Sequence, residues 1–377
     1  MKREIRKREE RTGIKMRILF LSAANSAHTV RWVNSIADRG HEVILVSQKD
    51  HRVEMDWIST KVKTIYLPVK GKKGYYLNAF FLKVIYMLEH VDVVNAHYAS
   101  GYGTLARIAR LPDVLLSVWG SDVYEFPYES RTKEKILKKN LNYAALIAST
   151  SYCMARQTEK IIGKREMVIT PFGVDTERFR KYAEKKNGCF TIGSVKTLSS
   201  KYGIDMIIKA FYLFSDQLDD IEDVQLVIFG EGSQRNELVH LCKTLGIMEK
   251  VHFEGYIPNT QVPDALNEMD IICFGSKQES FGVAAVEAMS CSIPVIATKA
   301  AGYKEVVEDG KTGYLVSYGD TETMAAYMLK LYRDKGLRDE IGRNGRNRVE
   351  KLYDWNQCVD TMIHSYMKIK TKDKHTI

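Results

Sequence analysis

Short apolar runs rich in β-branched residues recur along this chain, and longer segments with helical spacing of apolar side chains separate them. The runs are continuous rather than alternating, which is typical of parallel strands that helices cover on both faces. Five lie in each half of the chain: Arg17–Ser22, Glu42–Ser47, Val91–Ala96, Val114–Val118 and Ala145–Ser149, then Phe190–Gly193, Val224–Gly230, Val251–Gly255, Asp270–Phe274 and Ile293–Thr298. The pattern predicts an α/β protein with two doubly wound, Rossmann-like domains in series.

The length of 377 residues agrees with two domains of roughly 150–200 residues each. We expect the boundary in the polar run Tyr182–Gly188, which gives an N-terminal domain of residues 1–187 and a C-terminal domain of residues 188–354. Residues 355–377 are expected to form a helix that returns to the N-terminal domain. In open parallel sheets, ligands bind beyond the carboxyl ends of the strands, and a cleft between two domains is a favoured pocket.

The composition excludes several classes of protein. Apolar residues make up 45% and charged residues 27% of the chain, as in ordinary globular proteins. No uninterrupted apolar stretch has the length of a membrane-spanning helix, and the charged start lacks the apolar core of a signal peptide, so we expect a cytoplasmic protein. The six cysteines show no metal-binding spacing, which argues against structural zinc.

The net charge of +9 is distributed unevenly. Residues 1–187 hold 34 Lys and Arg against 20 Asp and Glu, a balance of +14, whereas residues 188–377 hold 22 against 27, a balance of −5. Such asymmetry indicates that the basic half meets an anionic partner, either nucleic acid or an acidic membrane surface.

The segment after the run Asp270–Phe274 is the first candidate site. It combines a Gly/Ser loop, Glu279, a Phe-Gly pair and an Ala-rich helix that carries Glu287. The helix start offers backbone N–H groups to a phosphate or a sugar hydroxyl, and two carboxylates can address different parts of one extended ligand. The spacing alone is equally compatible with a first-turn acid and a solvated helix charge.

The sequence ESFGVAAVEAM resembles the E-x7-E motif of the retaining glycosyltransferases of family 4, which have the GT-B fold. Further segments resemble family motifs in the correct order: Pro171–Phe179 (PFGVDTERF), Phe229–Ser233 (FGEGS), Pro294–Ala297 (PVIA) and Glu305–Gly313 (EVVEDGKTG). The resemblance therefore covers most of the chain. It implies the GT-B fold, with the two domains facing across a cleft.

The resemblance also implies roles for individual residues. Glu279 would meet hydroxyls of the donor sugar, and Glu287 would hold the ribose. Backbone amides of the residues that follow Glu279, together with the Gly-rich turn, would meet the sugar and the diphosphate; these residues are Ser280, Phe281, Gly282, Val283 and Gly230. Neither a metal nor another cofactor is implied.

A second candidate site follows the run Phe190–Gly193. Lys196 and Lys201 lie five residues apart in a Ser-rich loop, where they can bracket a diphosphate, although two exposed loop lysines would look the same. The segment resembles the family's GRL-x-x-x-KG signature with two departures, because Lys196 replaces the Arg and Tyr202 intervenes before Gly203. A lysine lacks the bidentate fork of an arginine, so charge is kept and geometry is less defined.

Candidate residues of the N-terminal domain also follow predicted strands. Asn25 and His28 lie after the first strand, where family members contact the acceptor and the donor phosphates, although a capping or surface histidine is equally compatible with His28. Asp122 lies in a segment resembling the family's HGSD stretch, but Trp119 replaces its histidine. We therefore expect His97, which ends another strand, to be the catalytic histidine.

The resemblance implies a metal-independent glycosyltransferase that retains anomeric configuration. It would move a hexose or an N-acetylhexosamine from a nucleotide sugar, with UDP favoured, to a saccharide or lipid-linked acceptor in cell-surface polysaccharide or glycolipid synthesis. The rival interpretations are a sugar-nucleotide epimerase of the same fold and a non-catalytic sugar-nucleotide-binding subunit. A nucleic-acid partner explains the charge but not the E-x7-E context, and we expect none.

Two basic segments, Lys70–Tyr86 and Arg131–Lys139, combine positive charge with apolar side chains. This combination suits an anionic membrane interface, so we expect peripheral binding to the cytoplasmic membrane face. A core helix with solvated lysines is an equally good interpretation from the sequence.

Overall fold

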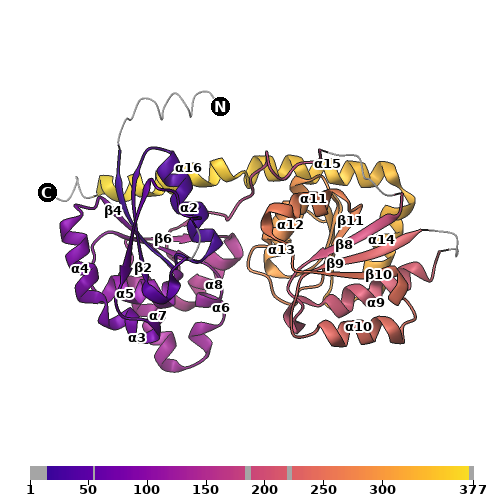
Figure 1. The fold of residues 1–377 in the computed structure, drawn as a ribbon, viewed down its shortest axis with the longest axis horizontal. Coiled ribbons are helices and arrows are strands. Elements are labelled where there is room, and N and C mark those ends of the chain that lie inside the picture. The colour runs from indigo at the N-terminus through magenta and orange to yellow at the C-terminus, as the bar shows by residue number, and fades with distance from the viewer. Residues whose placement is uncertain (1–14, 54–55, 183–187, 219–222, 373–377) are drawn as a thin grey trace. The chain divides into compact units, whose positions relative to one another are not determined.

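The computed structural model describes residues 15–53, 56–182, 188–218 and 223–372 (Figure 1). The chain divides into two compact units. The first comprises the described residues up to Thr170 and those from Val359 onward, and the second comprises Pro171–Cys358. Among the described residues, no helix has both the length and the apolar character needed to cross a membrane.

The first unit contains a parallel sheet with the strand order β3-β2-β1-β4-β5-β6-β7. The strands are β1 (Arg17–Leu21), β2 (Glu42–Gln48), β3 (Val62–Leu67), β4 (Val93–His97), β5 (Val114–Val118), β6 (Leu146–Ser149) and β7 (Met167–Ile169). Since β1 leads outward to β2 and β3, and β4 leads outward on the other side, the winding reverses between β1 and β4. At such a reversal, the loops after the two central strands diverge and leave room for a ligand.

Helices cover both faces of this sheet. They are α2 (Ala27–Asp38), α3 (Gly71–Leu77), α4 (Ala79–Leu88), α5 (Gly103–Ile108), α6 (Ser121–Tyr124), α7 (Arg131–Tyr143), α8 (Tyr152–Ile162) and α16 (Trp355–Lys372). Val94 and Ala96 of β4 join the core that α4, α5 and α7 cover. Asn95 lies between them in β4 and therefore points to the other face, where its amide donates to the Tyr366 hydroxyl of α16 at 2.7 Å.

The second unit repeats this plan with the parallel strand order β10-β9-β8-β11-β12-β13. The strands are β8 (Phe190–Val195), β9 (Val224–Phe229), β10 (Val251–Gly255), β11 (Ile271–Phe274), β12 (Val295–Thr298) and β13 (Gly313–Val316). The helices are α9 (Ile204–Ser215), α10 (Arg235–Thr244), α11 (Val262–Asn267), α12 (Val283–Ser290), α13 (Ala301–Val306), α14 (Thr321–Arg333) and α15 (Lys335–Leu352). Here the winding reverses between β8 and β11.

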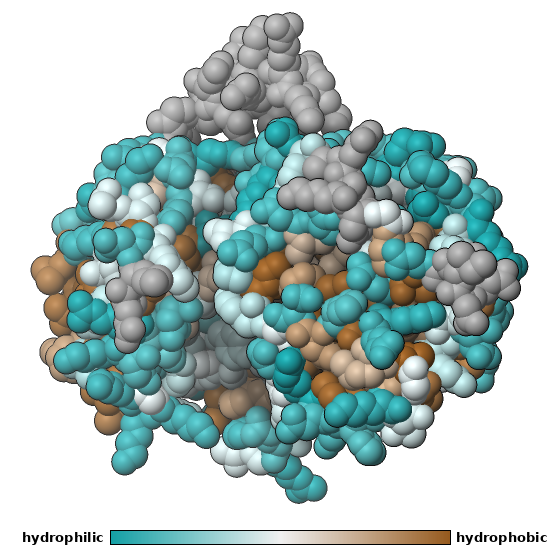
Figure 2. All heavy atoms as spheres, turned by 45° about the vertical axis from the view of Figure 1, so that its right-hand side comes forward, coloured by the Kyte–Doolittle hydropathy of each residue, from teal (hydrophilic) through white to brown (hydrophobic). Residues whose placement is uncertain are grey.

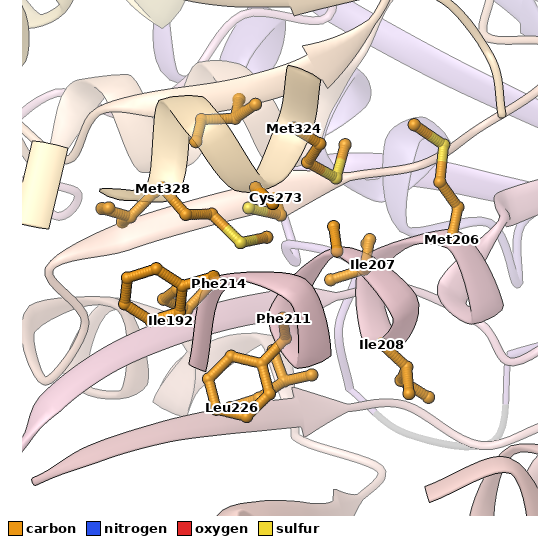
Figure 3. Close-up of a cluster of buried hydrophobic side chains, with 14 of the residues drawn as sticks. Ile192, Met206, Ile207, Ile208, Phe211, Phe214, Leu226, Cys273, Met324 and Met328 are labelled. Carbon is orange, nitrogen blue, oxygen red and sulfur yellow. The ribbon is translucent and has the colours of Figure 1, made fainter. Parts of the chain in front are cut away.

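The core on one face of this sheet lies between α9, α14 and the central strands (Figure 3). Phe211 and Phe214 of α9 and Met324 and Met328 of α14 are fully buried there, together with Ile192 of β8 and Leu226 of β9. Burial of such large side chains stabilises the unit by about 1.5–3 kcal/mol each. A rigid sheet therefore supports the loops at its carboxyl edge.

The division between the units lies at Thr170/Pro171, earlier than the boundary at 187/188 that we expected from the sequence. The reason is packing, because the segment after Thr170 is bonded to the second unit. Val174 pairs with Asp354, and the carbonyl of Phe179 accepts from the Ser290 hydroxyl at 2.6 Å. Most of the polar run 182–188, from 183 to 187, lies outside the described residues.

We predict that Tyr366→Phe lowers the free energy of unfolding by about 1–3 kcal/mol, because Asn95 loses a buried hydrogen-bond acceptor. Urea unfolding followed by circular dichroism measures this change. Tyr256→Phe is the matched control, since Tyr256 is exposed in the second unit. An equal, near-zero effect in both variants would contradict the role given to the Asn95 contact.

Candidate functional site

The loops after β8 and β11 meet at the winding reversal of the second unit. The backbone N–H of Lys277 donates to the carbonyl of Lys201 at 3.0 Å. A Cβ atom at Gly203 would overlap the carbonyl oxygen of Gly275, and one at Gly275 would overlap that of Gly203. Gly203 also has a left-handed backbone (φ +59°), so glycine suits it on both counts. The two sequence-predicted loops are therefore held against each other.

An ion pair joins these loops. The ammonium of Lys196 lies 2.7 Å from Oε2 of Glu279, and the two side chains are only 18% and 14% exposed. The same ammonium lies 4.7 Å from the ring centre of Tyr202, a cation–π contact. The two departures from the family signature, Lys196 and Tyr202, are thus in contact, and Tyr202 helps to hold the Lys196 ammonium.

Tyr303 of α13 lies against the Lys196–Glu279 pair. Its hydroxyl lies 3.1 Å from the Ser276 hydroxyl and 3.4 Å from Oε2 of Glu279. Burial raises the pKa of Tyr303, so the phenol stays protonated and can donate. Burial alone would lower the pKa of Lys196, but its interactions with Tyr303 and Glu279 outweigh burial and raise it. Lys196 is therefore a fixed positive charge at neutral pH.

Helix α12 begins beside this pair. Gly282, the residue before its first turn, has φ +99°, and a Cβ atom there would lie 2.9 Å from the Tyr303 ring. The backbone N–H of Ser280 donates to Oε1 of Glu279 at 3.2 Å, while Val283 starts the helix, as the sequence predicts. Glu287 is half-buried on the same helix.

Phe281 anchors the loop. Its side chain is buried against the rings of Phe172 and Tyr353, with centroids 6.4 Å and 5.5 Å away. Its side chain is thus part of the core of the second unit, and only its backbone remains available for the role that the resemblance implies.

The turn at Gly230 sets the position of Lys196. The backbone N–H of Lys196 donates to the carbonyl of Phe229 at 2.9 Å, and a Cβ atom at Gly230 would overlap the carbonyl oxygen of Lys196. Lys201, by contrast, is exposed on a short 3₁₀ turn, Ser200–Tyr202. The structure therefore brings Lys196 together with Glu279, whereas Lys201 contributes its backbone to the loop contact.

The first unit places its candidate histidines at its own winding reversal, between β1 and β4. His97 ends β4 and is fully buried between Phe20 and Trp119, with ring centroids 4.4 Å and 4.5 Å away. Neither ring nitrogen of His97 has a hydrogen-bond partner in the described part of the chain. Buried polar groups are normally paired, so these nitrogens are unusual.

His28 lies in the first turn of α2, with its ring 5.8 Å from that of Trp119. Burial, together with the nearby Arg31 charge, lowers the pKa of His28 to about 4. Burial, together with His28, also lowers the pKa of His97 well below the ordinary value. Both imidazoles are therefore neutral at pH 7.

Asp122 and Asn25 differ in their surroundings. The buried carboxylate of Asp122 accepts the backbone N–H groups of Ala99 at 2.9 Å and Gly120 at 2.8 Å. It thus ties the loop after β5 to the segment after β4, which favours a positioning role. Asn25 is exposed, and its backbone N–H donates to the carbonyl of His51 at 3.0 Å.

Three features of these sites were missed in the sequence. Tyr303 and Ser276 support Glu279, and Ser194 at the end of β8 has a buried hydroxyl without a partner among the described residues. Tyr98, directly after His97, has a φ of +74°, which is rare outside glycine. No sequence pattern identifies a buried tyrosine as part of a site. Across the described chain, no cluster of three or more His, Cys, Asp or Glu could hold a metal.

Two family models match the chain. "Glycosyl transferases group 1" matches residues 175–348, and "Glycosyl transferase 4-like" matches residues 17–151. The chain belongs to the group 1 glycosyltransferases. Its two sheets with their separate cores have the GT-B fold, as the sequence predicts.

Curated relatives of this glycosyltransferase include N-acetyl-alpha-D-glucosaminyl L-malate synthase from Bacillus anthracis, which is 24% identical over 76% of this chain and 77% of its own. Mannosylfructose-phosphate synthase from Agrobacterium fabrum is 23% identical over 91% and 87% of the two chains. Among solved structures, sucrose-phosphate synthase from Thermosynechococcus elongatus aligns with a TM-score of 0.81 at 18% identity, covering 95% of this chain and 100% of that one. Anabaena HepE aligns with a TM-score of 0.74 at 20% identity, covering 94% and 100%.

We predict that Gly203→Ala destabilises the glycosyltransferase by about 2–4 kcal/mol, because a left-handed backbone and a backbone overlap both oppose the new Cβ. Gly246→Ala is the matched control: its φ is +70°, but nothing lies within 4 Å, so only about 1 kcal/mol is expected. Urea unfolding measures both. Equal losses would contradict the close approach of Gly203 and Gly275.

We also predict that acid destabilises the first unit through His28 and His97, whose pKa values are lowered in the folded chain. The unfolded chain takes up protons near pH 6.5, while folded His28 does so near pH 4, so stability is full above pH 6.5 and is lost as the pH falls toward 4. The loss is at most about 1.4 kcal/mol per pH unit for each imidazole. His28→Gln should flatten this dependence between pH 7 and 5 in urea unfolding. The control is His240→Gln, in an exposed site on α10, and a His28→Gln slope like that of the control would contradict the assignment.

Proposed function

We propose that this glycosyltransferase is a retaining enzyme that transfers a hexose or an N-acetylhexosamine from a UDP sugar to a saccharide or lipid-linked acceptor. The observation that carries this proposal is the buried Lys196–Glu279 pair, supported by Tyr303, at the winding reversal of the second unit. A ligand that enters this site must satisfy a fixed cation and a carboxylate that lie side by side.

A nucleotide sugar has the complementary groups. Its diphosphate offers anionic oxygens to Lys196, and the hydroxyls of its sugar can donate to Glu279. A ligand that separates a desolvated ion pair must offer each charge a new partner, because an unpaired buried charge is costly. A donor that carries both a diphosphate and a sugar therefore suits the site better than a ligand with only one of these groups. The start of α12 and Lys201 would add further positive potential for the diphosphate.

The proposed reaction is a front-face displacement. The acceptor oxygen forms a bond to the anomeric carbon while the bond from that carbon to the phosphate oxygen breaks. The acceptor proton passes to the leaving phosphate, whose negative charge Lys196 stabilises. Glu279 holds the donor sugar in the reactive orientation.

We propose that the first unit binds the acceptor, with His97 as the group that orients its hydroxyl. The unpartnered nitrogens of a neutral His97 support this role, because they can accept or donate one hydrogen bond each. The ring is fully covered, so contact with an acceptor requires Phe20 or Trp119 to move. His28 and Asn25, after β1, would line the same edge of the sheet.

The names of similar proteins support the choice of donor and acceptor. HepE was solved with UDP and with UDP-glucose, which makes UDP sugars the first donors to test. Relatives include a capsular polysaccharide biosynthesis glycosyltransferase from Staphylococcus aureus and a phosphatidyl-myo-inositol mannosyltransferase from Mycobacterium leprae. These names support a role in cell-surface polysaccharide or glycolipid synthesis.

We predict that Glu279→Gln lowers the rate of UDP release from its UDP sugar by about 100-fold or more while UDP itself still binds, because the carboxylate contacts the sugar rather than the nucleotide. A thermal-shift panel of UDP, GDP, ADP and their sugar conjugates first identifies the donor. The rate of UDP release from that donor is then measured for the parent enzyme and for Glu279→Gln, and the two rates are compared.

Glu254→Gln is the matched control for this experiment, because Glu254 is exposed on β10 of the same unit. It should leave turnover unchanged. Near-normal turnover in folded Glu279→Gln enzyme would overturn the assignment of Glu279, and the absence of any shift with all three nucleotides would overturn the proposed donor class.

A further inference from the structure

Helices α3 and α4 present large apolar side chains to solvent. Phe80 is 73%, Leu88 71% and Leu77 60% exposed. Tyr76, Phe81 and Met87 are also exposed. Within α4, Phe80 and Met87, like Phe81 and Leu88, lie seven residues apart, which is about two helical turns, so the four share one outward face. Brown hydrophobic side chains gather at the left-hand edge of Figure 2, the side on which Figure 1 labels α4. We call these six residues the α3–α4 surface.

The core of the first unit does not require these side chains. The opposite face of α4 already packs on that core through buried Leu82 and half-buried Ala79, Ile85 and Tyr86. The helix is therefore apolar on both faces although it lies at the edge of its unit. A helix that is apolar all round normally lies inside a protein or against lipid.

Positive charge flanks this surface. Lys70, Lys72 and Lys73 are exposed at the start of α3, and no acidic residue occurs from Lys70 to Leu88. Exposed apolar side chains beside basic ones match the acyl boundary and the headgroups of an anionic bilayer, respectively. An exposed acidic group, Asp50, lies beside these lysines and accepts the backbone N–H of Gly71 at 2.9 Å. Three lysines against one carboxylate leave this end of the surface basic, so its charge opposes the pairing of two such ends.

The other basic segment of the first unit differs. In α7, Lys138 pairs with Glu134 at 2.7 Å, and Lys133 pairs with Glu129. Two of its lysines are thus neutralised by nearby glutamates, one within the helix and one just before it. The structure thus distinguishes Lys70–Tyr86 from Arg131–Lys139, although the two segments look alike in sequence.

We propose that the α3–α4 surface docks the protein on an anionic lipid bilayer, with its apolar side chains in the interface and Lys70, Lys72 and Lys73 against the headgroups. The two helices contain seven and ten residues, so they would lie in the interface rather than cross it. This inference goes beyond the proposed function and does not rest on it.

The test is co-sedimentation of the full chain with vesicles of phosphatidylcholine containing 30 mol% phosphatidylglycerol, compared with pure phosphatidylcholine vesicles, at 100 mM salt. We expect binding to the anionic vesicles alone. Lys72→Ala/Lys73→Ala should weaken it by about 25-fold, at about fivefold per lysine. Phe80→Ser/Leu88→Ser should abolish it.

Matched controls change residues of the same types elsewhere. Lys135→Ala/Lys139→Ala removes two exposed lysines of α7, and Tyr256→Ser removes an exposed apolar side chain of the second unit. Both should bind as the parent chain does. Thermal shifts with UDP report separately on the donor site, so a failure of docking and a failure of the proposed function are distinguishable.

Three results would overturn the inference: no sedimentation of the parent chain with anionic vesicles, equal sedimentation with neutral vesicles, or equal losses in the surface and control variants. Light scattering adds a fourth outcome. A dimer of the parent chain that Phe80→Ser/Leu88→Ser dissociates would identify a second copy as the occupant of the surface.

Discussion

The structure depends on the need to cover a parallel strand on both faces. A central strand such as β8 or β1 buries four consecutive side chains, which point alternately to the two faces of the sheet. Helices must therefore lie above and below it, and the chain must cross over after each strand. In both units this winding starts from a central strand and proceeds outward in two directions. The reversal between β1 and β4, and that between β8 and β11, then place loops of unrelated segments together. Lys196 and Glu279, 83 residues apart, become neighbours for this reason.

Close backbone contact at the winding reversal between β8 and β11 restricts several positions to glycine. Gly203, Gly230 and Gly275 each lack the space for a side chain, because another loop's carbonyl group occupies it. These contacts fix the height of the Lys196 loop above the sheet. The ion pair is consequently held by the backbone around it as well as by charge, which is the preorganisation that electrostatic catalysis requires.

Continuous apolar runs identified most of the strands, since ten of them coincide with strands of the two sheets. The strands β3, β7 and β13 were not identified: all three lie at sheet edges, β3 carries exposed Lys63, and β7 has only three residues. Local composition carries too little signal for edges and short strands. The boundary was placed too late because Pro171–Phe179 binds the second unit through contacts that are distant in sequence.

At the candidate sites, the sequence pointed to residues on loops but not to the buried residues that pack against those loops. Glu279, Lys196 and the start of α12 lie in recognisable motifs, whereas Tyr303 is an aromatic side chain in a helix like many others. Asp122 carries a motif, yet its carboxylate is bonded to backbone groups. Only three-dimensional contacts distinguish a residue that faces a ligand from one that holds the loop in place.

The path of the chain between the two units has a consequence for its synthesis. The first unit is made of two segments of the chain, one up to Thr170 and one from Val359 onward, whereas the second unit is the continuous segment between them. The hydrogen bond from Asn95 to Tyr366 can therefore form only after Tyr366, 271 residues later in the chain, has left the ribosome. During translation, all residues of the second unit are therefore synthesised before the first unit is complete. The face of the first sheet that α16 covers remains accessible to chaperones until α16 has been synthesised.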